Sequence, residues 1–250
     1  MDLDPDFLRL PIAHRGLHRP GVPENSMAAF RAAIAAGYGI ECDLQRSADG
    51  TAMVFHDYDL TRLAGAEGLV AALSPAELAH HRLLGTDEAI PTLTEMLAEV
   101  AGRVPLLIEI KDTTPDSGAE VGDFPAAVAA ILAGYRGPVA VMSFNPHVVA
   151  AFHKAAPQIA VGLVTCGYEA EEWPALDTET RAHLARIVDF DAVGACFISH
   201  DRADLDNPAV TALKARGIPV LCWTVKSPAQ EQEARRVTDN ITFENFRPGI

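Results

Sequence analysis

The sequence predicts an α/β protein built as one TIM, or (β/α)8, barrel. Short apolar runs rich in β-branched residues alternate with alanine-rich segments of helical period along nearly the whole chain. The chain has 250 residues, which is a usual size for one such barrel. The first predicted strand is not followed by the G-x-G-x-x-G turn that is typical of an open dinucleotide-binding sheet. We therefore expect a single barrel domain that covers residues 1–250.

The eight predicted strands are short segments in which apolar and β-branched residues dominate. They cover residues 10–14, 39–44, 52–56, 104–111, 139–144, 159–165, 192–198 and 218–225. The predicted helices cover residues 26–36, 92–101, 123–134, 146–156, 178–188, 208–216 and 227–237. Asn25-Ser26 resembles a cap at the first of these helices, with Asn25 expected as the capping residue, and Thr92 with Glu95 resembles a capping box at the second. This order predicts parallel strands joined by helical crossovers.

The predicted barrel is irregular between its second and third strands. Twelve residues lie between Asp43 and His56, and four of them belong to the predicted third strand. A helical crossover needs about a dozen residues of its own, so we expect an extended link that turns at Asp49-Gly50. Residues 57–90 contain no apolar strand and are predicted to form a small insertion after the third strand, with a short helix inside it.

Charged and titratable residues gather at the ends of the first four predicted strands. In a barrel of this class, the catalytic groups lie at the carboxyl ends of the strands and in the loops that follow. The four segments carry His14-Arg15-Gly16, Glu41-Cys42-Asp43, His56-Asp57 and Glu109-Ile110-Lys111. Because side chains alternate along a strand, Glu41 and Asp43 share one face, and so do Glu109 and Lys111. Taken singly, each motif is typical of a solvated edge; together they predict a polar site at one end of the barrel.

Three of these side chains predict a metal site. The carboxylates of Glu41, Asp43 and Glu109 would repel one another in one cleft unless they were protonated or bound a cation. A ligand set made only of oxygen suits a hard ion, Mg2+ or Ca2+, better than Zn2+. The sequence therefore predicts one divalent cation as the cofactor.

The remaining side chains of the four segments predict phosphoester chemistry. His14 and His56 stay available for proton transfer, which is the commonest catalytic task of histidine. Arg15 and Lys111 supply positive charge that suits a phosphate group. A hard metal, two acid/base groups and two phosphate-binding cations together favour hydrolysis of a phosphoester.

The motifs, in their order along the chain, resemble those of the glycerophosphodiester phosphodiesterase family. The matching segments are His14-Arg15-Gly16, Pro23-Glu24-Asn25, Glu41-x-Asp43, Asp49-Gly50, His56-Asp57, Ile90-Pro91-Thr92-Leu93, Glu109-x-Lys111, Ser143-Phe144-Asn145-Pro146 and Trp223-Thr224-Val225. The resemblance extends from about residue 10 to 237. It implies a barrel with a helical insertion after strand 3. It also implies hydrolysis of glycerophosphodiesters to glycerol 3-phosphate and an alcohol.

The resemblance also implies a role for each matching residue. The implied roles are an acid/base pair (His14, His56), metal ligands (Glu41, Asp43, Glu109), phosphate contacts (Arg15, Lys111), a pocket wall (Trp223) and support of the metal or of Arg15 (Glu24). Near the C-terminus the chain departs from the family, which usually closes with a Thr-Asp-x-Pro-like segment. Residues 242–246 read TFENF instead. What this last loop contributes to substrate choice is left open by the sequence.

Composition narrows the partners that the protein can have. The formal net charge of −14 disfavours binding to nucleic acid or to an anionic lipid surface, which clustered Lys and Arg would favour. The acidic N-terminus has no apolar signal segment, and no apolar run approaches about 20 residues. We therefore expect a soluble cytoplasmic protein with a small-molecule substrate and no stable membrane association. The oligomeric state, a homo-oligomer included, is left open.

Two other functions fit the same predicted barrel. A related phosphodiesterase could act on lysophospholipids or sphingolipids, but such an enzyme should carry an apolar loop for docking on a membrane. The predicted insertion at 57–90 contains many charged residues, which favours a water-soluble substrate. A barrel retained only for binding should lack a histidine or a metal ligand, and every one of those positions is filled.

Overall fold

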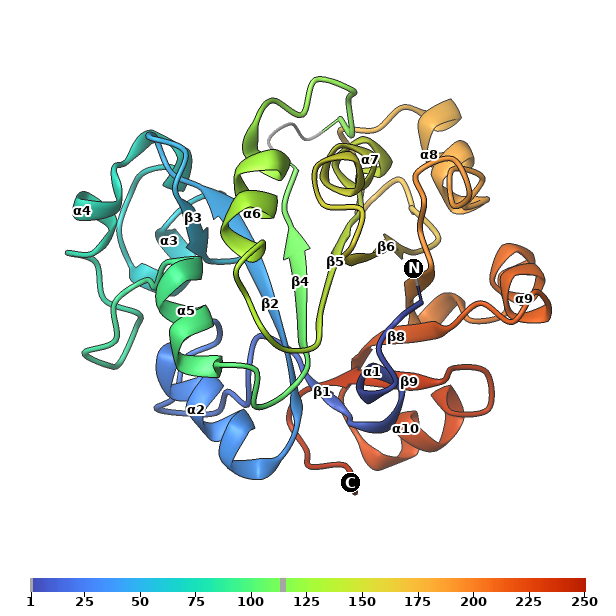
Figure 1. Ribbon diagram of the computed structural model, residues 1–250, viewed down its shortest axis with the longest axis horizontal. Coiled ribbons are helices and arrows are strands. Elements are labelled where there is room, and N and C mark those ends of the chain that lie inside the picture. The colour runs from blue at the N-terminus through green and yellow to red at the C-terminus, as the bar shows by residue number, and fades with distance from the viewer. Residues whose placement is uncertain (1, 113–115) are drawn as a thin grey trace.

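The computed structural model of the protein describes residues 2–112 and 116–250 (Figure 1). Parallel strands form a closed barrel, in which the last strand pairs with the first. In spatial order the barrel strands are β1 (Ile12–Ala13), β2 (Gly39–Arg46), β4 (Leu106–Ile110), β5 (Val139–Ser143), β6 (Ala160–Thr165), β7 (Phe197–Asp201), β8 (Val220–Val225) and β9 (Asn240–Phe243). The predicted (β/α)8 barrel is confirmed.

The prediction of which eight strands form the barrel was wrong at one position. Residues 52–56 were expected to be the third barrel strand, but β3 (Ala52–Val54) pairs antiparallel with β2 and lies outside the barrel. The link of five residues after β2 is too short to return the chain to the same end of the sheet, so it closes a hairpin. The eighth barrel strand is β9, which was not predicted because its run of apolar residues is very short.

Helices surround the strands of the barrel (Figure 1). They are α2 (Met27–Ala36), α5 (Leu93–Val100), α6 (Phe124–Leu132), α7 (Pro146–Ala155), α8 (Thr178–Ala185), η2 (Arg202–Asp204), α9 (Pro208–Ala215) and α10 (Pro228–Ala234). Each of the seven predicted helices is present. The capping box of Thr92 and Glu95 is confirmed, whereas the first helix is capped by Ser26, whose side chain accepts a hydrogen bond from the Ala29 N–H.

The predicted insertion is a separately packed unit beside the barrel (Figure 1). It contains α3 (Thr61–Ala64), η1 (Val70–Ala72) and α4 (Pro75–Leu78). Its apolar side chains form a cluster of their own with residues of β3 and the loop after it, namely Met53, Phe55, Leu60, Leu63, Val70, Leu78, Leu83 and Ile90. The strand β3 therefore belongs to the insertion as much as to the sheet, and it carries the chain from the barrel into this unit.

The barrel interior is apolar at one end and polar at the other. Along the inward face of β4, Leu107 belongs to the interior apolar cluster and is followed two residues later by Glu109. The short helix α1 (Asp6–Arg9) inserts Phe7 into the same cluster and so closes the amino end of the barrel. The backbone carbonyl of Phe7 accepts a hydrogen bond of 2.7 Å from the side chain of Asn240 in β9. The carboxylate of Glu109 therefore lies toward the carboxyl end of its strand, away from the end that α1 closes.

We expect the substitution Gly162→Ala to destabilise the barrel. A Cβ atom on Gly162 in β6 would lie 2.5 Å from the ring of Phe197, which is fully buried on the neighbouring strand. Overpacking of this kind costs about 1–3 kcal/mol in free energy of unfolding, which urea denaturation would measure. Gly134→Ala is the matched control, because among residues 2–112 and 116–250, local backbone and chain neighbours aside, no atom lies within 4 Å of the added carbon. Equal losses in the two variants would contradict the packing argument.

Within the described part of the chain, we find no helix whose length and apolar character would suffice to cross a bilayer.

Candidate active site

Three buried carboxylates face one another inside the barrel. Glu41 and Asp43 lie on the inward face of β2, and Glu109 lies on β4, where the strand register pairs it with Asp43. Their exposed fractions are 1%, 1% and 7%. One oxygen from each of the three groups lies within 4.8 Å of the other two. The alternation of side chains on two neighbouring parallel strands thus brings the three predicted metal ligands to one point.

Asp43 is the centre of a network of charged and polar side chains. Its Oδ1 lies 2.8 Å from the Nζ of Lys111, which also lies 2.5 Å from Oε1 of Glu109. Its Oδ2 accepts a hydrogen bond of 2.8 Å from the Nδ2 of Asn25 and lies 3.3 Å from the Nε of Arg15. The role expected of Asn25 as a helix cap is therefore wrong, because its side chain points into the barrel and contacts Asp43.

Burial and mutual repulsion set the charge state of these groups. Burial, assisted by the negative charges of Asp43 and Glu109, raises the pKa of Glu41 well above its ordinary range. Burial also acts to raise the pKa of Asp43, but Lys111 and other nearby cations outweigh it and the pKa is lowered. For Lys111, burial acts to lower the pKa, but Asp43 and Glu109 outweigh it and the pKa is raised. The donor set of three oxygens is one that Mg2+ or Ca2+ would fit, and a bound cation would offset the repulsion around Glu41.

Two histidines follow strands at the same end of the barrel. His14 comes directly after β1, and its Nε2 lies 4.0 Å from Oε2 of Glu41. His56 follows β3, and its Nδ1 lies 2.7 Å from Oδ1 of Asp57. The Nδ1 of His14 likewise faces a carboxylate. A carboxylate at Nδ1 favours the tautomer with its proton on that nitrogen, which leaves the lone pair on Nε2.

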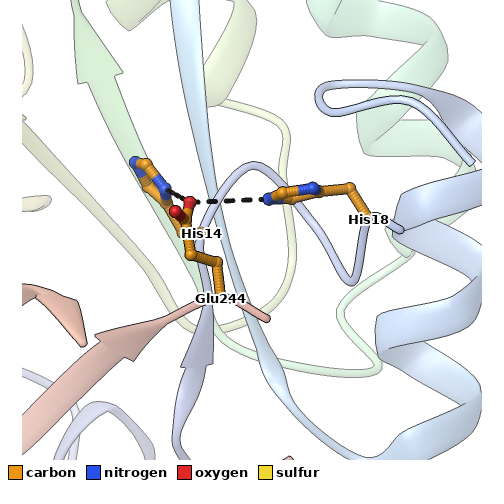
Figure 2. Close-up of side chains that lie close together, drawn as sticks. All are labelled: His14, His18 and Glu244. Carbon is orange, nitrogen blue, oxygen red and sulfur yellow. Dashed lines mark hydrogen bonds and ion pairs between the residues drawn. The ribbon is translucent and has the colours of Figure 1, made fainter. Parts of the chain in front are cut away.

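Glu244 is a residue of the site that the sequence analysis missed. It comes directly after β9, and its Oε2 lies 2.8 Å from the Nδ1 of His14 and 3.6 Å from the Nε2 of His18 (Figure 2). Its Oε1 lies 2.8 Å from the Nζ of Lys226. The neighbouring rings of His14 and then of His18 lower its pKa, so Glu244 is a carboxylate. The signal in the sequence was a short strand-like run, Ile241-Thr242-Phe243, followed by an acidic residue.

A chain of ion pairs joins the insertion to the barrel. Arg62 in α3 donates to Asp57 at 2.6 Å and to Glu24 at 2.7 Å. Glu24 in turn accepts a hydrogen bond of 2.6 Å from Arg15. Burial acts to lower the pKa of Arg15, but the neighbouring carboxylates, Asp43 first, raise it. Glu24 thus contacts Arg15 directly, and the guanidinium of Arg15 also contacts Asp43 in the site.

Most of the predicted site residues line two cavities that share part of their lining. The smaller, of about 170 Å³, is lined by residues that include His14, Arg15, Glu41, His56, Glu109, Lys111 and Trp223. The larger, of about 440 Å³, shares His56, Glu109, Lys111 and Phe144 with it and extends to Tyr58 and Trp173. The indole N–H of Trp223 donates a hydrogen bond of 3.0 Å to the carbonyl of Ser199, which fixes this wall of the smaller cavity. The arrangement places two carboxylates, two imidazoles and a lysine around one cavity.

The chain is similar in sequence to known phosphodiesterases. The sequence model of the glycerophosphoryl diester phosphodiesterase family matches residues 14–240. A glycerophosphodiester phosphodiesterase of Caldanaerobacter subterraneus is 32% identical over 66% of this chain and 70% of its own length. One of Bacillus altitudinis is 33% identical over 61% of this chain and 65% of its own.

Solved structures agree in fold. A phosphodiesterase of Oleispira antarctica, in complex with the product sn-glycerol-3-phosphate, matches with a TM-score of 0.76 at 24% identity, over 96% of this chain and 94% of that one. A glycerophosphodiester phosphodiesterase of Thermotoga maritima matches with a TM-score of 0.71 at 23% identity, over 94% of each chain. At these identities the likeness shows the barrel fold.

Proposed function

Because the chain belongs to the glycerophosphoryl diester phosphodiesterase family, we propose that its site hydrolyses glycerophosphodiesters to glycerol 3-phosphate and an alcohol. The observation that carries this proposal is the convergence of three buried carboxylates, one lysine and two histidines at the carboxyl ends of the strands. The chain is a phosphodiesterase by family, and the side chains that it brings together are those that such a reaction needs.

The carboxylates and the lysine prepare the site for a phosphate group. Glu41, Asp43 and Glu109 would hold one divalent cation, Mg2+ or Ca2+. When bound, the cation neutralises negative charge that develops on a phosphoryl oxygen. Lys111 remains charged beside Asp43 and Glu109 and faces the shared cavity, where it binds the phosphate together with Arg15. Glu24 positions Arg15.

His14 and His56 act as the acid/base pair. Each ring has a carboxylate at Nδ1, Glu244 for His14 and Asp57 for His56, which orients the ring and leaves Nε2 to exchange the proton. One histidine removes the proton from the attacking oxygen, and the other donates a proton to the oxygen of the leaving alcohol. The attacking oxygen belongs to water or to the glycerol 2-hydroxyl. The second route passes through a cyclic glycerophosphate, which chromatography of early time points would detect.

The substrate is a small diester. Two adjacent cavities, of about 170 and 440 Å³, share His56 and Lys111 in their lining and would give separate room for the glycerophosphoryl group and for the alcohol. Trp223 forms one wall together with Phe144, whose ring centroid lies 5.6 Å away. The precedent of a related phosphodiesterase with sn-glycerol-3-phosphate bound supports this product.

A coupled assay for released glycerol 3-phosphate tests the proposal. It should cover glycerophosphocholine, glycerophosphoethanolamine, glycerophosphoglycerol and glycerophosphoinositol, with Mg2+ and Ca2+ each supplied alone. We expect release from at least one diester with at least one cation, and loss of release after chelation. A parallel panel of lysophospholipids covers the competing substrate class. Cleavage of those lipids alone, or full activity in the presence of chelator, would contradict the proposed reaction.

A further inference from the structure

A second group of metal-ligating side chains lies beside the three carboxylates. His14, His18 and Glu244 come together from the loop after β1 and from the end of β9 (Figure 2). One donor atom from each lies within 4.8 Å of the other two. The side chains are 16%, 20% and 14% exposed, so the cluster is shielded but within reach of solvent.

The ring of His18 has a buried nitrogen that lacks a hydrogen-bond partner among the residues that the structure describes. Its Nε2 is buried and makes no hydrogen bond to the residues that the structure describes, although it points at Oε2 of Glu244 from 3.6 Å (Figure 2). The other oxygen of Glu244 is held by Lys226 at 2.8 Å, which orients the carboxylate. Outer contacts of this kind commonly fix carboxylate ligands in metal sites. The proposed acid/base pair makes no use of His18, and its position next to Glu244 calls for another explanation.

We propose that His14, His18 and Glu244 form a second metal site, which binds Zn2+ or a similar borderline cation. Two imidazole nitrogens and one carboxylate oxygen favour such ions, whereas the all-oxygen set inside the barrel favours Mg2+ or Ca2+. Two ligands of a tetrahedral zinc ion lie roughly 3.3 Å apart, given zinc–ligand bonds of about 2.0–2.1 Å. The distances of 2.8 and 3.6 Å from Glu244 to the two rings lie on either side of that value.

Space for further ligands is present next to the cluster. A cavity of about 220 Å³ is lined by His18 and Glu244 together with residues of both loops, among them Gly16 and Asn245. A water molecule could complete a zinc site from this side. None of the residues that line this cavity is among those that line the smaller cavity beside Glu41 and Glu109.

Zinc at this site would inhibit the reaction. The ion would take the Nδ1 of His14 and the carboxylate of Glu244, and so replace the hydrogen bond that orients the catalytic ring. With Nδ1 bound to the ion, the neutral ring would carry its proton on Nε2, which then has no lone pair to accept a proton. This effect on the rate rests on the proposed function, whereas binding of the ion does not.

Inhibition by Zn2+ in excess Mg2+ or Ca2+ provides the first test. We expect the wild-type enzyme to be inhibited, and His18→Asn to keep its basal rate while its inhibition constant for Zn2+ rises at least about tenfold. His80→Asn, an exposed histidine of the insertion, is the matched control and should behave as wild type. Zinc that acted at Glu41, Asp43 and Glu109 would instead be displaced by more Mg2+, with no effect of His18. That outcome would overturn the proposal.

Binding without turnover provides the second test. Co2+ bound by imidazole has a characteristic visible absorption, so titration of the Mg2+-saturated protein with Co2+ reports the site directly. We expect the absorption in wild type and His80→Asn, and its loss in His18→Asn and Glu244→Ala. Equal absorption in wild type and His18→Asn would refute the site even if the enzyme cleaves glycerophosphodiesters. Conversely, an inactive protein that shows the His18-dependent absorption would contradict the proposed function and leave the metal site standing.

Discussion

Glu41→Gln is expected to remove at least about 10³-fold of activity while the protein remains folded. The substitution takes one oxygen anion from the proposed cation site, and loss of the metal removes several kcal/mol of charge stabilisation in the transition state. The backbone N–H of Arg15 donates to Oε2 of Glu41 at 2.9 Å, and a glutamine oxygen can accept the same bond. Activity and the content of bound Mg2+ or Ca2+ are the measurements.

The pKa of Glu41 gives this prediction a stability control. Because the pKa is raised in the folded state by burial and by Asp43 and Glu109, the folded protein holds a proton that the unfolded chain releases. When chelator is present, Glu41 should therefore contribute to the free energy of unfolding of the wild type. This contribution decreases as the pH rises above the ordinary pKa range of a glutamate. Glu41→Gln removes this contribution. A variant that is inactive because it is unfolded would contradict this reading.

Asp43→Asn is the contrasting variant. Asp43 is buried and pairs with Lys111 and Arg15, so its neutralisation leaves two cations that are 11% and 16% exposed with one partner fewer each. Breaking a buried ion pair from one side costs about 3–5 kcal/mol. We therefore expect Asp43→Asn to lose both activity and stability, whereas Glu41→Gln loses activity alone. Denaturant unfolding of both variants in chelator separates the two effects.

His56→Ala is expected to lower kcat by about 10²–10⁴-fold, the usual contribution of one acid/base group. The imidazole lines both cavities and is oriented by Asp57 at 2.7 Å. Its side chain is about one third exposed, so its removal should cost little stability. Rates measured with a diester whose alcohol is a good leaving group should recover part of the loss if His56 protonates the leaving oxygen.

The matched control for this prediction is His147→Ala. His147 also follows a barrel strand, but its side chain is exposed and does not line either cavity. We expect its rate to stay within about twofold of the wild type. A small effect of His56→Ala, comparable to that of His147→Ala, would show that the acid/base assignment is wrong.

The barrel could be predicted from the sequence because alternation of strands and helices is a local signal. Local patterning does not report the direction of a short strand, so residues 52–56 were placed in the barrel although β3 pairs antiparallel with β2. The four-residue strand β9 has too few apolar positions to stand out. Strand alternation did place Glu41 and Asp43 on one inward face, with Cys42 turned to the surrounding helices.

Contacts between distant loops could not be predicted in the same way. The pairing of His14 with Glu244 joins residues 230 positions apart, and it forms only because β9 closes the barrel against β1. The path from Asp57 through Arg62 to Glu24 depends on how the insertion packs, which no periodic pattern encodes. These contacts decide ring orientation and charge balance, so the finer properties of the site had to come from the structure.

The separate apolar cluster of the insertion has a consequence for how the enzyme fails under stress. One half of the proposed acid/base pair, His56, is carried by this unit, while His14 is carried by the barrel. Two contacts hold the histidines in position relative to each other, namely the pairing of β3 with β2 over three residues and the ion pairs of Arg62. Opening of the smaller unit alone would pull the two imidazoles out of alignment at a fraction of the free energy of global unfolding. We therefore expect activity to be lost before the barrel unfolds.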